Sequence, residues 1–214
     1  MVGSLPTIPL PVPPPRRPLD PGDRVRHWYE NELGWATVPG APVRLVVGRR
    51  FDVLDVPLEA GRAALRHPGL RPGGPASPVA VQADRMRLLV AAGSAEELPE
   101  LLRWLEWDAL DLDLVGLGAG TQMDAPPPPG AGSRAHAREE RPGPQGAAEW
   151  LRPPEPGREV ETSLPAMPAV PAPGGGGGGP GLVRLVNTVA THCHRIRLRH
   201  ACGLPPALPR AFGP

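Results

Sequence analysis

The sequence predicts an α/β protein of the α+β type, with one mixed-sheet core, a disordered Pro/Gly-rich tail and a C-terminal amphipathic helix. Helix and strand patterns alternate between residues 24 and 125. Two pairs of expected strands are joined by tight turns, which favours a mixed sheet over a doubly wound parallel one. The 34 prolines and 27 glycines of the 214-residue chain gather largely outside this stretch, as is typical of low-complexity segments.

Composition divides the chain into five expected segments. Residues 1–23 form a Pro-rich disordered arm, which could dock in an aromatic groove or remain a solvated terminus. The α/β core at 24–125 is followed by a low-complexity Pro/Gly-rich linker at 126–180, in which only the stretch around Trp150 could fold back on the core. A basic amphipathic helix at 181–202 and a disordered tail at 203–214 complete the chain.

The first half of the core is expected to hold a helix, three strands and a second helix. Asp23 can cap the first helix, which ends at Gly34 in the C′ position. Pro57 ends the third strand, because proline cannot donate a ladder hydrogen bond. The strands are expected at 35–38, 43–47 and 51–56, and the second helix at 58–67.

The second half of the core is expected to begin with a hairpin of strands 78–82 and 86–91. Ser94 then opens a helix in which Glu97 would complete a capping box. The apolar stripe of this helix consists of Leu98, Leu101, Leu102 and Leu105. The last strand of the core is expected at 121–125.

The C-terminal helix, about residues 182–200, shows the sharpest amphipathic pattern in the sequence. Its apolar face consists of Leu182, Leu185, Val186, Val189, Cys193 and Ile196. No acidic residue follows Glu161, so this end of the chain is purely basic. The helix could place arginines on nucleic-acid phosphates or on an acidic partner, or it could dock its apolar face on the core. The candidate nucleic-acid-binding residues are Arg184, Arg195, Arg197 and Arg199.

Four aspartates are candidates for holding Mg²⁺, the ion that strand-end carboxylates bind in phosphoryl transfer. Asp52 and Asp55 lie on one expected strand, but their odd separation places them on opposite faces. Asp111 and Asp113 share a face of an expected strand at 110–115. The alternative for that pair is the charged solvent face of an edge strand.

The histidines and cysteines near the C-terminus, His192, Cys193, His194, His200 and Cys202, do not match a zinc template. We therefore predict no metal site there, and Cys193 is expected on the apolar face of the helix. Two cysteines near one end give no disulfide framework. The first residues lack a basic n-region, and no apolar run reaches the length of a membrane span. These absences predict a cytoplasmic protein with no membrane contact.

Three stretches of the core carry the motifs Leu33-Gly34-Trp35-Ala36-Thr37-Val38-Pro39 and Phe51-Asp52-Val53-Leu54-Asp55-Val56 and the expected hairpin of residues 74–90. Together they resemble the N-terminal domain of bifunctional DNA primase-polymerases (prim-pol), in a degenerate actinobacterial type. The first is similar to the family's opening strand, the second to its aspartate-bearing strand and the third to its substrate-proximal hairpin. The resemblance covers about residues 25–125 and implies an archaeo-eukaryotic primase type of fold, a Mg²⁺-dependent nucleotidyltransferase reaction and Asp55 as the first metal-binding acid.

The sequence departs from the family pattern at the residues that carry the chemistry. Pro57 occupies the place of the second acid, and Asp84-Arg85-Met86-Arg87 stands where the family has a nucleotide-contacting histidine. Because one carboxylate cannot bridge two metals around a triphosphate, the resemblance implies a vestigial site at Asp55 with no cofactor, Mg²⁺ being needed only if activity is retained.

Three functions remain open from the sequence. The first is a non-catalytic prim-pol-like protein that binds nucleic acid, a nucleotide or a replication-related partner. The second is a regulatory adaptor that acts through the Pro-rich arm and the C-terminal helix. The third is an active nucleotidyltransferase that uses Asp55 with Asp52, Asp111 or Asp113. The oligomeric state is left undetermined.

Overall fold

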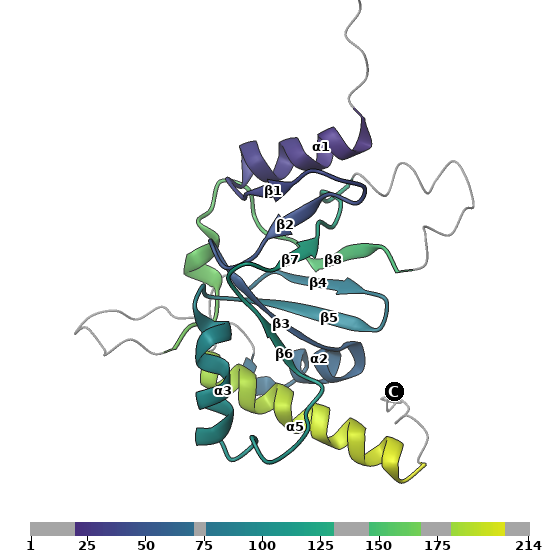
Figure 1. The fold of residues 1–214 in the computed structure, drawn as a ribbon, viewed down its shortest axis with the longest axis vertical. Helices are drawn as coiled ribbons and strands as arrows, with labels where there is room; N and C mark the ends of the chain where they lie inside the picture. Colours follow the sequence, from purple (N-terminus) through teal and green to yellow (C-terminus); the bar gives the residue numbers. More distant parts are fainter. Residues whose placement is uncertain (1–19, 71–75, 131–145, 168–180, 204–214) are drawn as a thin grey trace, which may run out of the picture.

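The computed structural model describes residues 20–70, 76–130, 146–167 and 181–203. Figure 1 shows two sheets in the middle of the molecule, with helix α1 on one side and helices α2, α3 and α5 on the other. Most of the expected Pro-rich arm, the glycine run at 174–179 and the tail beyond residue 203 lie outside the described residues.

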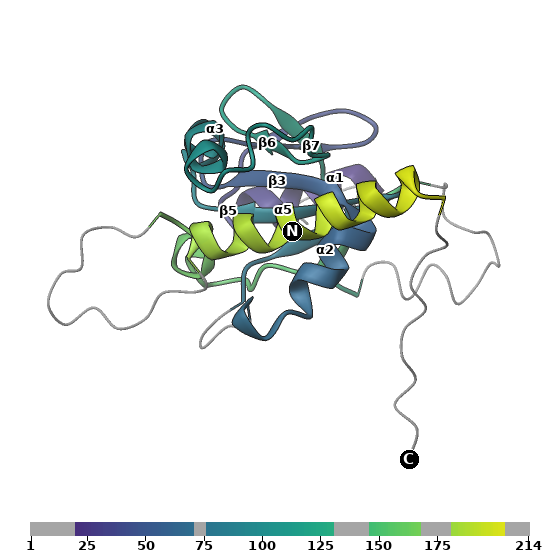
Figure 2. The same ribbon diagram turned by 90° about the horizontal axis from the view of Figure 1, so that it is seen from below.

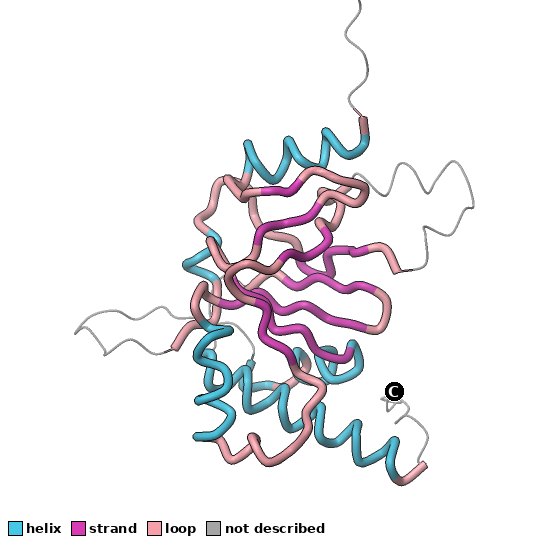
Figure 3. Tube along the Cα trace, viewed as in Figure 1, coloured by secondary structure: helices cyan, strands magenta, loops and turns pink. Residues whose placement is uncertain are grey.

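The larger sheet has five strands in the order β6-β3-β5-β4-β8, and all of its neighbouring pairs are antiparallel. Helices α2 (Leu58–Leu65) and α3 (Ser94–Trp104) link β3 to β4 and β5 to β6. Each helix thus joins two parallel strands that have another strand between them, the split βαβ arrangement (Figure 3). The strands are β3 (Asp52–Pro57), β4 (Val79–Gln82), β5 (Arg85–Val90), β6 (Val115–Leu117) and β8 (Ala148–Arg152).

The smaller sheet consists of β1 (Thr37–Val38), β2 (Arg44–Val46) and β7 (Gln122–Asp124), also antiparallel throughout. The α+β class is confirmed. The described strand pairs are antiparallel, however, where the sequence predicted a mixed sheet. Each parallel pair that a helix connects has another strand between its members, β5 between β3 and β4 and β3 between β5 and β6, so no two parallel strands are neighbours in the larger sheet.

One face of the larger sheet is covered by α2, α3 and α5 (Leu182–Ala201). In Figure 2, α5 crosses this helical layer beside α2. All six residues of the predicted apolar face of α5 are buried in the core. The basic helix at 181–202 is therefore part of the core and not a separate unit. No helix in the described ranges has both the length and the hydropathy needed to cross a membrane.

The other face of the larger sheet packs on an aromatic cluster. Helix α1 (Pro21–His27) continues into a π-helical turn, η1 (Trp28–Glu32), that buries Trp28 and Tyr29. Tyr29 stacks on Trp35 at 5.8 Å between ring centroids, and Trp35 lies 4.6 Å from Phe51. The Tyr29 hydroxyl donates a 2.7 Å hydrogen bond to the Pro126 carbonyl. The aromatic cluster therefore also holds the segment that follows β7.

The core extends beyond residue 125, which corrects the predicted linker at 126–180. Strand β8 pairs with β4, and the expected fold-back of Trp150 is confirmed: its Nε1–H donates a 3.0 Å hydrogen bond to the Tyr29 hydroxyl oxygen. A 3₁₀ turn, η3 (Val160–Ser163), buries Val160, and Leu164 follows it into the core. A few apolar residues in a Pro-rich stretch suffice here because the sheet already offers an apolar face.

Two helix starts differ from the prediction. Asp20, not Asp23, caps α1 by accepting a 2.9 Å hydrogen bond from the Gly22 amide. Ser94 is the first residue of α3 rather than its cap. The Ala95 amide is instead bound at 2.9 Å by a carboxylate oxygen of Asp52, from β3. A distant side chain thus does the capping, which local sequence cannot reveal.

The predicted strand at 110–115 is wrong. Residues 110–114 form an irregular segment, and only Val115–Leu117 pair with β3. Leu112 and Leu114 both turn toward the helical core. The alternation of leucines and aspartates therefore belongs to a loop whose two leucines point into the core. The predicted helix at 58–67 ends at Leu65, and a 3₁₀ turn, η2, follows at Pro68–Leu70.

If α5 belongs to the core, Leu182→Ala should lower the free energy of unfolding by about 3 kcal/mol, because Leu182 is 0% exposed. Leu198→Ala is the matched control on the same helix, since Leu198 is 49% exposed. Urea unfolding followed by circular dichroism measures both. Equal effects of the two substitutions would mean that α5 does not pack as described.

Candidate functional site

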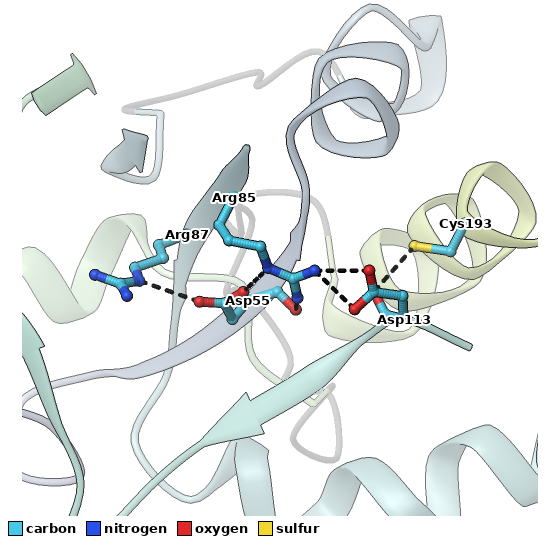
Figure 4. Close-up of polar contacts among 5 residues, drawn as sticks. All are labelled: Asp55, Arg85, Arg87, Asp113 and Cys193. Carbon is cyan, nitrogen blue, oxygen red and sulfur yellow. Dashed lines mark hydrogen bonds and ion pairs between the residues drawn. The ribbon is translucent and has the colours of Figure 1, made fainter. Parts of the chain in front are cut away.

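Asp55 lies at the centre of an ion-pair network at the hairpin end of the larger sheet (Figure 4). Its two carboxylate oxygens accept hydrogen bonds from Nε of Arg85 at 2.5 Å and from Nε of Arg87 at 3.1 Å. Both arginines come from β5, where Arg87 is directly opposite Asp55. Arg85 also donates from Nη1 to both carboxylate oxygens of Asp113 at 2.7 Å.

The Arg85 guanidinium occupies the space between two carboxylates that a metal would need. It joins Asp55 to Asp113, so these acids approach each other only through a fixed positive charge. Asp111 is paired elsewhere, with Arg197 at 3.1 Å. Among the residues that the structure describes, no three or more His, Cys, Asp or Glu side chains come together as a metal site would require.

Asp52 points to the opposite face from Asp55, as the odd spacing predicts. It is 1% exposed and lies at the start of α3. Burial raises the pKa of its carboxyl group above the usual value, and hydrogen bonds from the Ala95 and Gly93 amides partly offset this effect. Asp52 therefore caps a helix from within the core, and the strand body separates it from Asp55.

The arginines of the β4–β5 hairpin determine the surroundings of Asp55. Arg85 and Arg87 have the same-face spacing of a strand, so both reach the same carboxylate. Their alternation around Met86 is visible in the sequence, but their target is not, because the pairing register of β3 and β5 decides it.

A second cluster of charges lies on the outer side of the helical layer, where α2 meets α5. We call it the basic α2–α5 surface. His192, Arg195 and Arg199 lie on one flank of α5, at the 3–4 spacing of a helix. The end of α2 adds neighbouring positive groups. The surface consists of Arg66, His67, His192, Arg195 and Arg199.

The electrostatics of this surface are visible at His192. Burial lowers the pKa of its imidazole, and the nearby charges of Arg195, His67, Arg199 and Arg66 lower it further. Glu59 of α2 forms a 2.7 Å ion pair with Arg199. The arginines of this surface are therefore held close enough together to affect a shared neighbour, His192.

The four predicted nucleic-acid-binding arginines have different surroundings. Arg197 pairs with Asp111 and Arg199 with Glu59, so both also brace α5 against the core. Arg184 and Arg195 are exposed, and Arg195 forms no ion pair with a carboxylate in the described part of the chain. Arg66 and His67 were missed by sequence reasoning, since only the packing of α2 beside α5 brings them to this surface.

The histidines and cysteines of α5 point in different directions. Cys193 is buried in the apolar core, where burial raises the pKa of its thiol to about 12, while Cys202 is exposed. His194 lies against Trp107 at 6.0 Å between ring centroids, away from the α2 flank that holds His192. The predicted apolar role of Cys193 is confirmed.

No protein-family model matches the chain, and searches of curated proteins and of solved structures gave no significant match. The candidate sites therefore stand on the geometry of this chain alone.

If Asp55 is a structural ion-pair partner, Asp55→Asn should lower the free energy of unfolding by about 3 kcal/mol, because the partly buried Arg87 loses its carboxylate partner and Arg85 keeps only the exposed Asp113. Asp113→Asn is the control. Its carboxylate is 63% exposed, so the loss should stay below about 1 kcal/mol. Urea unfolding gives both values. A midpoint that rises with Mg²⁺ in the wild type but not in Asp55→Asn would contradict this role.

The raised pKa of Asp52 makes a prediction about pH. The unfolded chain binds this proton with the ordinary pKa of about 3.9, and the folded chain binds it more tightly. Stability from this group is therefore present at low pH and lost as pH rises through the folded pKa. The stability of Asp52→Asn relative to wild type should rise over that interval in urea unfolding from pH 3.5 to 6.5. A constant or falling difference would exclude the assignment.

Proposed function

We propose that this protein is a non-catalytic, prim-pol-like protein that binds DNA phosphates through the basic α2–α5 surface. The observation that carries the proposal is the gathering of Arg66, His67, His192, Arg195 and Arg199 on one surface, with Arg195 left unpaired by any described carboxylate. Chains of phosphates are bound mainly by arginine and lysine side chains, and Arg66, Arg195 and Arg199 are the arginines gathered here.

The catalytic alternative loses support from the Asp55 network. Both Asp55 oxygens accept hydrogen bonds from arginines, and the positive charges of these arginines would repel a divalent cation at this position. Recruiting Asp113 would require Arg85 to leave both acids, and Asp52 lies on the opposite face. The charges at this site are arranged to neutralise one another.

The adaptor alternative also loses part of its basis. A helix that docks in a partner's groove presents an apolar face. The apolar face of α5 is already buried against α2, α3 and β3, so its exposed side offers mainly polar and basic side chains. The exposed side of α5 can therefore contact a partner through charged groups but not through an apolar face.

Binding should therefore depend on salt and on individual arginines. Arg195→Gln and Arg66→Gln should each weaken binding to a labelled DNA duplex at low salt. Each should also reduce the slope of log K against log salt by about 0.9 if the residue contacts one phosphate. Fluorescence anisotropy between 25 and 200 mM salt measures both quantities.

The matched control is Arg158→Gln, which removes an arginine that pairs with Glu155 away from this surface. Deleting residues 181–214 is not a usable test, because it would remove core side chains together with the charges. Salt-independent binding, or equal losses in all three variants, would overturn the proposal. If the protein bound an acidic protein but not DNA, the DNA-binding proposal would be wrong, and the surface would be assigned to a protein partner.

A further inference from the structure

A second candidate site lies at the edge of the helical core, where strand β8 contains an irregularity. The register of β4 and β8 shifts between Val79, opposite Arg152, and Ala80, opposite Trp150. In a regular strand Trp150 and Arg152 would share a face. The bulge at Leu151 instead sends Arg152 to the helical side of the sheet, while Trp150 stays with the aromatic cluster.

Arg152 borders a pocket that is otherwise largely apolar. The pocket is a partly open hollow whose empty space is about 370 Å³ when the open solvent at its mouth is counted. Its apolar walls come from α2, η2, β4, β5 and α5, through Leu65, Leu70, Val79, Leu88 and Leu185.

The Arg152 guanidinium has few partners of its own. Its Nη1 donates a 3.1 Å hydrogen bond to the Ser77 carbonyl, and no described carboxylate pairs with it. Partial burial without a counter-charge lowers the pKa of this group. A guanidinium carries five N–H donors, so several remain for a planar anion.

We propose that this pocket binds a small carboxylic acid with an apolar tail, the carboxylate on Arg152 and the tail against the leucines. The charge supplies the head-group preference, since a carboxylate accepts two parallel hydrogen bonds from a guanidinium. The leucine walls supply the tail preference. The pocket shares no residue with the basic α2–α5 surface, so this inference goes beyond the DNA-binding proposal and does not rest on it.

Hexanoate is a suitable probe, with acetate, hexan-1-ol and hexyl phosphate as comparisons. In calorimetric titrations hexanoate should bind saturably, and acetate or hexan-1-ol at least about tenfold more weakly, because each lacks one half of the interaction. Arg152→Met keeps an apolar stem of similar length and should weaken hexanoate binding at least about tenfold. Arg158→Met is the matched control and should leave binding unchanged.

Arg152→Met should fold as well as the wild type, since it removes a partly buried charge that lacks a counter-charge. If it does not fold, Arg152→Lys keeps the charge but loses the planar fork and should show an intermediate loss. Absence of saturable hexanoate binding to the wild type would overturn the proposal, as would equal binding to the wild type and Arg152→Met. Tighter binding of hexyl phosphate would overturn the choice of a carboxylate.

Discussion

The compensation of charge on β3 is the constraint on which the rest of the structure depends. This strand runs through the larger sheet with neighbours on both sides, and five of its six residues are buried, two of them aspartates. A buried carboxylate is tolerated only if it is hydrogen-bonded or paired. One oxygen of Asp52 accepts a hydrogen bond from the Ala95 amide at the start of α3, and both oxygens of Asp55 are bound by Arg85 and Arg87. Each acid thereby fixes one neighbour: the first holds α3 against the sheet, and the second holds the hairpin of β4 and β5.

The same strand explains why α5 has a basic outer side. The helical face of the sheet is apolar through Leu54 and Val56, so α5 must bury an equally apolar stripe to cover it. Its positive residues are left on the remaining flanks. Two of them, Arg197 and Arg199, brace the helix through Asp111 and Glu59, while Arg195 faces outward beside the end of α2. The packing of an apolar stripe thus decides where the uncompensated charge appears.

Sequence reasoning succeeded where a pattern is local and failed where the decisive partner is distant. The apolar face of α5 and the opposite faces of Asp52 and Asp55 follow from helix and strand periods alone. The strand at 110–115 failed because the alternation of Leu112 and Leu114 with acids fits a loop as well as a ladder. The cap of α3, the pairing of Asp55 and the membership of Arg66 in the basic surface each depend on contacts between separate elements. None of them leaves a signature in one stretch of residues.

The two proposed sites follow from one distinction between the charges of this chain. Asp55, Arg85 and Asp113 are hydrogen-bonded to one another, and such groups have few free donors or acceptors left for a ligand. Arg195 and Arg152 are held in place without a described counter-charge, the first on an open helical surface and the second beside apolar walls. Several arginines gathered on an open surface suit a phosphate chain, whereas a single arginine beside leucines suits a small acid with an apolar tail. The surroundings of each unpaired arginine, rather than its presence, therefore determine which anion it can recognise.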